Sequence, residues 1–215
     1  MSKNPRTSKV KGFLLDPTIR LNSADREVFR DLARAEFIPD DLANKHYYRN
    51  NKSDATRRLD RLVEAGLLTR HVTHEHGKGQ TKVYAFANDS IARAWGGKIS
   101  AFGANRTLQH EIITSRLYFH LGRPDDFRKE NAFNKNDKSF LKLNVGEGRD
   151  YTPDALYTNS DGELCLIEAD SGQYNKTQIL KKQTAWRSVK QVWGQPKNAF
   201  APILNTAHNI SVVHF

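Results

Sequence analysis

Cysteine is almost absent from this chain of 215 residues, where Cys165 stands alone inside the apolar run LCLI. One cysteine can form neither an intrachain disulfide nor a CxxC zinc site, so Cys165 is expected in the core of a cytoplasmic protein. Long apolar runs are missing too, since none approaches the roughly 18 residues of a membrane span. No apolar stretch follows the basic start MSKNPRTSKVK as a signal peptide requires, so we expect no membrane insertion and no export by that route.

Positive charge, by contrast, is in excess. Lysine and arginine number 34 against 24 aspartates and glutamates, which gives a formal net charge of +10. Such an excess favours an anionic partner, either nucleic acid or a membrane surface. The basic residues are not gathered on an amphipathic helix with an apolar face, which argues against the membrane. Residues 1–100 carry 19 basic and 12 acidic side chains, so electrostatic binding of an anionic partner is expected mainly in the N-terminal half.

The N-terminal half reads as three helices followed by two strands. Apolar residues at helical spacing follow Asn22 and stop before Pro39, which itself opens a second short helix with two acids. Ser53 is an N-cap candidate for a third helix that Gly66 ends. Alternating strands follow at 67–74 and 81–86, on either side of the turn EHGKGQ.

This order is typical of a winged helix-turn-helix, with the third helix as recognition element and EHGKGQ as the tip of the wing. The phrase LDRLVEAGLLTR followed by a basic wing resembles the winged-helix domains of bacterial regulators and plasmid proteins. We therefore expect a basic N-terminal arm at 1–21 and a DNA-binding domain at 22–100. The expected DNA contacts are Lys52, Arg57, Arg58, Arg61, Lys78 and Lys82. Because Asp54 and Asp60 dilute this basic surface, a solvated face of a protein-binding winged helix is the alternative.

The C-terminal half, from the polar stretch GGKISAFGANR onward, predicts an α/β sandwich at 101–215. It has no glycine-rich phosphate loop and no Rossmann repeat. Helical spacing occupies 107–123 and 175–193. The predicted strands, antiparallel before the second helix, are 126–133, 140–145, 154–158, 163–169 and 209–215.

Three acids flank the predicted strands of this half. Asp154 follows Pro153, while Glu168 and Asp170 end the strand ELCLIEAD across a hairpin turn. Side chains two residues apart on a strand share a face, so Glu168 and Asp170 point the same way and Asp154 can join them. Converging carboxylates repel one another and favour a divalent cation, here Mg²⁺ or Mn²⁺ because all the ligands are oxygens. The alternative is a set of ordinary surface acids at strand ends.

The pattern PD at 153–154 followed by Glu168-Ala-Asp170 resembles the PD-(D/E)XK signature of restriction-endonuclease-like nucleases, with Asp170 where a lysine is usual. The longer strings TLQHEIITSRLYFHL, TPDALYTNSDGELCLIEADSGQ and ILKKQTAW are similar to the replication-relaxation family and the related MobC-type plasmid mobilisation relaxases. The similarity spans roughly Asn22 to Trp186. It implies a winged helix followed by a restriction-endonuclease-like domain.

The resemblance also implies a site and an activity. The residues that it makes metal-binding or catalytic are Asp154, Glu168, Asp170, Lys182, His110 and Glu111. The nucleophile is either metal-activated water or a tyrosine, with Tyr174 and Tyr151 as candidates. The implied activity is nicking of one strand at an origin of transfer, with duplex and single-stranded DNA, relaxosome accessory proteins and coupling proteins as partners. A DNA-binding regulator or replication accessory protein with an inactive nuclease-like domain is the alternative.

Overall fold

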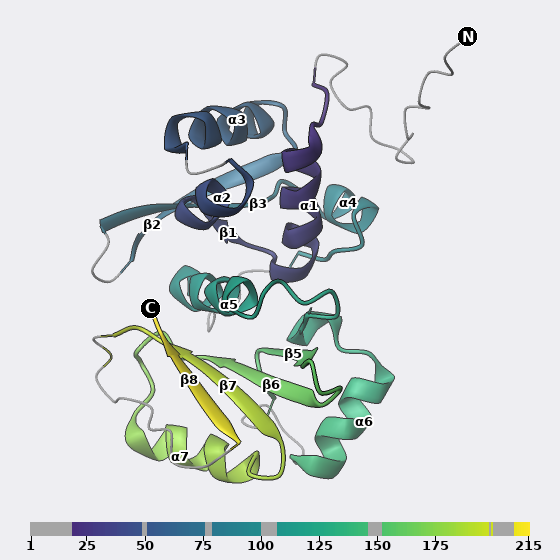
Figure 1. Cartoon of the computed structure of the whole chain (residues 1–215), viewed down its shortest axis with the longest axis vertical. Coiled ribbons are helices and arrows are strands. Elements are labelled where there is room, and N and C mark those ends of the chain that lie inside the picture. Colours follow the sequence, from purple (N-terminus) through teal and green to yellow (C-terminus); the bar gives the residue numbers. More distant parts are fainter. Residues whose placement is uncertain are drawn as a thin grey trace.

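The protein is described here from a computed structural model, which covers residues 19–48, 51–75, 79–99, 107–145, 152–197, 199 and 209–215. Over these residues it is a mixed α+β structure with seven α-helices and two sheets (Figure 1). None of the helices in these ranges is long and apolar enough to cross a membrane. The expected basic arm falls outside these ranges except for its last three residues.

The elements have the following bounds. The helices are α1 (Ser23–Ala35), α2 (Asp40–Tyr47), α3 (Lys52–Glu64), α4 (Asp89–Ala94), α5 (Leu108–His120), α6 (Lys135–Asn144) and α7 (Lys176–Ala185), with a 3-10 turn η1 at Glu130–Ala132. The strands are β1 (Ile38–Pro39), β2 (Leu68–Glu75), β3 (Gly79–Phe86), β4 (Arg128–Lys129), β5 (Ala155–Thr158), β6 (Leu164–Ala169), β7 (Lys190–Gln195) and β8 (Ile210–His214).

The N-terminal half packs α1 to α4 around a small antiparallel sheet of order β1-β3-β2. Helix α1 begins as its sequence predicts, because Asn22 and Asp25 form a reciprocal capping box. Helix α3 begins earlier than expected. Its N-cap is Asn51, whose side chain accepts from the N–H of Asp54, and the predicted cap Ser53 lies inside the first turn.

The C-terminal half is built on a five-stranded sheet of order β4-β5-β6-β7-β8. Strands β4, β5 and β6 are antiparallel, as expected, whereas β6, β7 and β8 run parallel. Helix α7 is the crossover between β6 and β7, which parallel neighbours require. Figure 1 shows α6 and α7 on the face of this sheet that lies away from α5.

Three strand and helix predictions for this half were wrong. The segment 140–145 belongs to helix α6, because Asn134 and Asp137 form a capping box that starts a helix there. Only two residues of 126–133 form a strand, namely β4. The helical pattern at 175–193 ends at Ala185, and its last residues belong to strand β7. Every residue of β7 after Lys190 is buried, so this strand shows no period-two alternation in the sequence.

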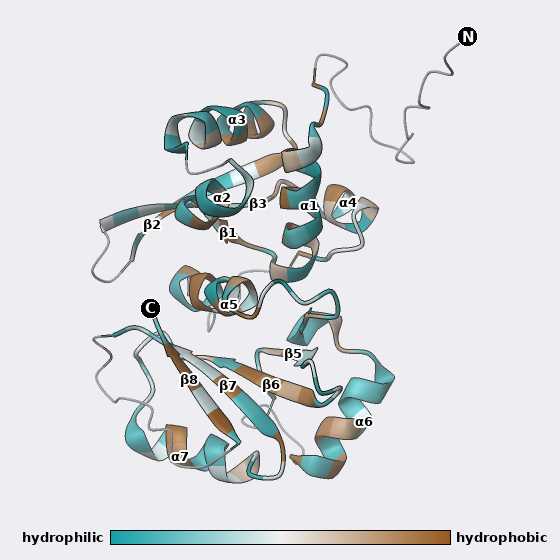
Figure 2. Ribbon diagram, viewed as in Figure 1, coloured by the Kyte–Doolittle hydropathy of each residue, from teal (hydrophilic) through white to brown (hydrophobic). Residues whose placement is uncertain are grey.

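Helix α5 lies between the two halves and is buried on nearly every side from Glu111 to Phe119. Below it, Gly194 of β7 allows close approach, since a Cβ there would lie 2.8 Å from side-chain carbons of Ile113 and Leu117. Figure 2 shows apolar residues along α5 and along the strands beneath it. One continuous hydrophobic cluster therefore includes side chains of both halves, from Val28 to Val192.

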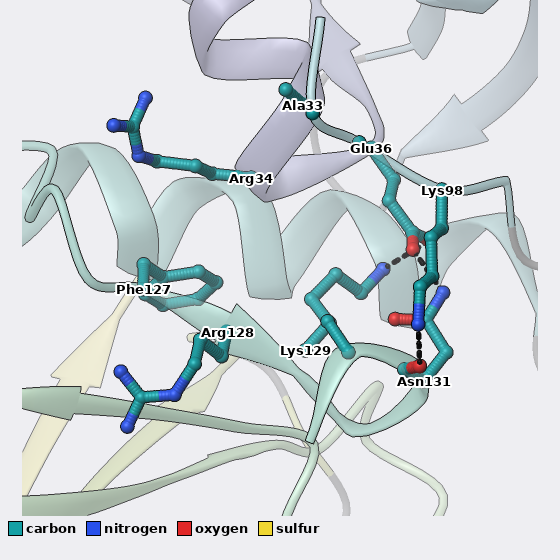
Figure 3. A pocket seen from close by; sticks show the side chains of 11 residues that line it. Ala33, Arg34, Glu36, Lys98, Phe127, Arg128, Lys129 and Asn131 are labelled. Carbon is teal, nitrogen blue, oxygen red and sulfur yellow. Dashed lines mark hydrogen bonds and ion pairs between the residues drawn. The ribbon is translucent and has the colours of Figure 1, made fainter. Parts of the chain in front are cut away.

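A buried charge network also joins the halves. The ammonium group of Lys129 on β4 donates to Glu36, at the end of α1, with a distance of 3.0 Å, and to Glu111 on α5. Asn131 donates to the other oxygen of Glu36 (Figure 3). Glu36 reaches this position from a left-handed backbone with φ of 65°, which is strained for a residue that is not glycine. A cavity of about 60 Å³ lies beside the network; it has room for water-sized molecules and none for a nucleotide.

Candidate active site

The site lies where strand β5 begins and strand β6 ends. Asp154 directly precedes β5, and Glu168 is the last but one residue of β6. His110 comes from the first turn of α5, and Lys182 comes from the last turn of α7. Four elements that are far apart in sequence thus bring two acids and two basic side chains together.

Asp154 is fixed by backbone and side-chain contacts. Its N–H donates to the carbonyl of Ile167 at 3.0 Å, and its Oδ2 accepts the N–H of Ala169 at 2.8 Å. The same oxygen lies 2.9 Å from Nε2 of His110. Burial by itself raises the pKa of Asp154, but the charge and hydrogen bond of His110 outweigh burial and lower this pKa to about 2. Asp154 is therefore a carboxylate at neutral pH.

His110 is the reciprocal partner. Burial by itself lowers its pKa, but the Asp154 carboxylate outweighs burial and raises the pKa above its ordinary value. Its other ring nitrogen, Nδ1, is buried and has no hydrogen-bond partner among the residues that the structure describes. The imidazole therefore balances the charge of Asp154.

Glu168 is fully buried and has two neighbours on one oxygen. Its Oε1 accepts a hydrogen bond of 2.7 Å from the hydroxyl of Tyr174 and also contacts the ammonium of Lys182. Burial raises the pKa of Glu168, the nearby Asp154 carboxylate raises it further, and although Lys182 opposes both effects the pKa reaches about 7. Its Oε2 is buried and has no hydrogen-bond partner within the described part of the chain. Two interacting acids thus titrate far apart, which is typical of catalytic carboxylates.

Asp170 does not join these two acids. Its Oδ1 accepts backbone N–H bonds from Gly172 at 2.9 Å, Gln173 at 3.1 Å and Tyr174 at 3.2 Å. Its Oδ2 accepts from Nε2 of Gln195 at 2.8 Å. Strand β6 ends at Ala169, so the alternation that predicted a shared face with Glu168 no longer applies. Asp170 holds the loop that carries Tyr174.

A three-carboxylate metal cradle is not found. Within the residues that the structure describes, no group of three or more His, Cys, Asp or Glu side chains could hold a metal ion. The pair Asp154 and Glu168 still suits magnesium or manganese, because Mg²⁺ is commonly held by one or two carboxylates together with water and substrate phosphate. The buried, unpartnered Oε2 of Glu168 is an oxygen that such an ion would satisfy.

Of the other predicted site residues, some lie beside the acid pair and others do not. Lys182 is mostly buried beside Glu168, whereas Lys181 is exposed. Glu111 contacts Lys129 rather than the acid pair. Tyr174 lies in the site, where burial first and then the charges of Glu168 and Asp154 raise the pKa of its hydroxyl. Tyr151 is outside the described residues.

Some of the predicted DNA contacts are paired with acids of the protein, and others are exposed. Arg58 donates to the buried carboxylate of Asp25 at 2.9 Å and to the carbonyl of Arg20 at 2.8 Å, so it fastens α3 to the start of α1. Arg57 is exposed and pairs with Asp54. The remaining predicted contacts are exposed Lys52 and Arg61, half-buried Lys82, and Lys78, which lies outside the described residues.

Sequence patterns did not identify Gln195, Gln109 or Lys129. Gln195 binds Asp170, and Gln109 joins α5 to strand β2 through a 3.0 Å hydrogen bond from its Nε2 to the carbonyl of His74. Lys129 lies in the predicted strand 126–133, where nothing in the sequence distinguished it from the other polar residues. Each partner lies 18 or more residues away in the chain, beyond the reach of helical or strand periodicity.

Comparisons with protein-family models, with curated proteins and with solved structures found no match to this chain. The function of the site is therefore inferred from its own residues.

Proposed function

We propose that this protein is a divalent-metal-dependent DNA-nicking enzyme that acts as a plasmid mobilisation relaxase. Its N-terminal half would bind the origin of transfer as a winged helix, and its C-terminal half would cut one strand as a restriction-endonuclease-like domain. Accessory and coupling proteins of a relaxosome are the partners that this activity needs.

One observation carries the proposal. Asp154 and Glu168 approach from neighbouring strands in a buried setting, and their pKa values are driven apart to about 2 and about 7. Burying two acids side by side is unfavourable for folding. Such an arrangement is more often kept for chemistry than for stability, and it supplies two of the three acids that the resemblance to PD-(D/E)XK nucleases implies.

The side chains have distinct roles in this proposal. Asp154 and Glu168 would hold Mg²⁺ or Mn²⁺, an ion that polarises phosphodiester oxygens when bound. Lys182 supplies a positive charge beside Glu168, suited to the developing charge on the phosphate. It stands in for the lysine that the signature has at position 170. His110 keeps Asp154 ionised and oriented.

The order of elements in the N-terminal half supports the winged-helix proposal. Helices α1, α2 and α3 are followed by the β2–β3 hairpin, and β1 pairs with the far side of β3. In such a domain α3 enters the major groove. Its exposed Lys52 and Arg61 are the basic residues best suited to reach DNA, since Arg57 and Arg58 are paired with acids.

A nicking assay on supercoiled plasmid that carries the cognate origin tests the proposal. With Mg²⁺ or Mn²⁺, the parent is expected to give open circles, whereas Asp154→Asn and Glu168→Gln should be slower by roughly a hundredfold or more. The matched control is Asp161→Asn, an exposed turn carboxylate that pairs with Lys190 at 3.4 Å, away from the acid pair. If both site variants nick as fast as this control, the site assignment fails.

A second function is favoured by Asp170. It replaces the expected lysine and is saturated with hydrogen bonds, while His110 and Lys182 already balance the two remaining acids. These features suit a DNA-binding regulator or replication accessory protein with an inactive nuclease-like domain. Titration of Mn²⁺ into the parent by calorimetry separates the two: heat that is lost in Glu168→Gln supports the enzyme, and no heat with specific DNA binding supports the regulator.

A further inference from the structure

The first turn of α5 connects the β2–β3 hairpin to the acid pair. Gln109 donates to the carbonyl of His74 near the end of β2, at 3.0 Å. The next residue, His110, contacts Asp154 at 2.9 Å. Two adjacent residues of one helix therefore touch the hairpin and the candidate active site.

This connection is rigid. Behind it, Phe37, Val83, Ala85 and Ile112 form a buried cluster, so the inner face of the hairpin is packed against α5. The rings of Phe37 and His71 also meet edge to face, with centroids 6.3 Å apart. Since packed cores resist sliding, the hairpin and the acid pair are expected to keep a fixed separation.

The separation is short on the scale of DNA. The two hydrogen bonds are 3.0 and 2.9 Å long, and the Cα atoms of Gln109 and His110 lie about 3.8 Å apart. The path from the carbonyl oxygen of His74 through these two side chains to the carboxylate oxygen of Asp154 is therefore roughly 20 Å at most. At about 3.4 Å for each base pair, this path spans about six base pairs. A duplex that touches the hairpin therefore also passes close to the part of the sheet where Asp154 and Glu168 lie.

The outer face of the hairpin suits a duplex. Val72 is 55 % exposed and pairs across the ribbon with Lys82, while His74 pairs with Gln80. A ribbon with one exposed apolar side chain among basic and polar ones can contact a DNA groove and its phosphates. Figure 1 shows that the hairpin and the C-terminal end of β8 point to the same side of the molecule. The end of β8 lies beside the site, because Phe215 donates to the carbonyl of Gln195, whose side chain binds Asp170.

We propose that the β2–β3 hairpin and the surface beside the carboxylate pair contact one continuous stretch of DNA, so that the cut falls at a fixed offset within about six base pairs of the hairpin contact. The inference rests on the proposed function for the cut itself, but the shared DNA surface can be tested without it. Recognition and cleavage are then one binding event, with no looping between separate sites.

The test uses two tethered probes. Cys165 is buried, so a single new cysteine at exposed Gln80→Cys on the hairpin, or at exposed Gln173→Cys beside the site, can be labelled selectively with an iron chelate. Each labelled full-length protein is bound to a 30-base-pair duplex selected from a random library for binding, and hydroxyl-radical cuts are mapped on both strands. The two cut centres are expected to lie within about six base pairs of each other.

Three results overturn the shared surface: cut centres more than one helical turn of about 10 base pairs apart, no cuts from the Gln173→Cys tether, or uniform ladders from both. The proposed function is judged separately by metal-dependent nicking of the same duplex by the unlabelled parent. Adjacent tether cuts without nicking would retain the shared DNA surface and reject the nuclease.

Discussion

The hydroxyl of Tyr174 donates to Oε1 of Glu168 at 2.7 Å, and the ammonium of Lys182 lies 3.3 Å from the same hydroxyl. The phenol of Tyr174 thus lies between the carboxyl group of Glu168 and the ammonium group of Lys182. It is a poor candidate for the attacking group, because burial and two neighbouring carboxylates raise the pKa of its hydroxyl.

We therefore expect Tyr174→Phe to slow nicking by about tenfold, through a less ordered Lys182, and not to abolish it. Denaturing gels of end-labelled DNA, with and without protease treatment, measure the rate and any protein attached to the cut strand. Complete loss of nicking, together with a protease-sensitive adduct in the parent, would instead make Tyr174 the nucleophile.

The raised pKa of Glu168 predicts how stability depends on pH. In the folded chain Glu168 keeps its carboxyl proton up to about pH 7, whereas the ordinary pKa of a glutamate is 4.5. Between these values the folded state binds more protons than the unfolded state, so stability falls as pH rises. The loss due to Glu168 is on the order of 3 kcal/mol across the window.

Glu168→Gln cannot ionise at this position and should lose less stability over that window. Urea unfolding of parent and variant at pH 5 and pH 8 gives the comparison. Equal changes in the free energy of unfolding for both proteins would contradict the prediction.

Lys129 is predicted to hold the two halves in one folding unit. Lys129→Ala leaves Glu36 and Glu111 buried next to each other without their cation, which costs about 3 to 5 kcal/mol. The matched control is Lys190→Ala, whose exposed ion pairs should contribute little to stability. Urea unfolding followed by far-UV circular dichroism compares the two variants, and similar losses for both would argue against the network.

Substitution of two arginines of α3 should affect stability in one case and the proposed DNA binding in the other. Arg58→Ala is expected to destabilise the protein by about 1 to 3 kcal/mol, because buried Asp25 loses its charged partner. Arg61→Ala should leave stability unchanged and reduce the slope of log affinity against log salt by about one, as removal of one phosphate contact does. Thermal melts and binding titrations at several salt concentrations measure these effects. If the salt slope is the same in both variants as in the parent, α3 is excluded from the DNA interface.

Helix positions in the first half could be predicted because local signals decide them. Asn22 and Asp25 start α1 through a capping box inside one helical turn, and α2 starts directly after Pro39 with two acids in its first turn. The capping box of Asn134 and Asp137 is the same kind of signal for α6, but FLKLNV was predicted as a strand and this signal was missed.

The site could be predicted only as far as strand geometry holds. Asp154 and Glu168 were placed together because they lie at ends of one antiparallel hairpin. Asp170 was misplaced because it follows the last strand residue, where backbone N–H groups of the next loop capture its carboxylate. Arg58 was assigned to DNA because nothing local reveals Asp25, which lies 33 residues away.

The burial of α5 between both halves constrains how this protein can evolve. A recombination event that replaced the N-terminal half would expose the upper face of α5 and leave Lys129 without Glu36, so the incoming module would need a matching surface of its own. Side chains on α3 and on the outer face of the hairpin carry no such restriction. If these surfaces bind DNA as proposed, new specificities are expected to arise by point substitution on them, and not by exchange of whole modules.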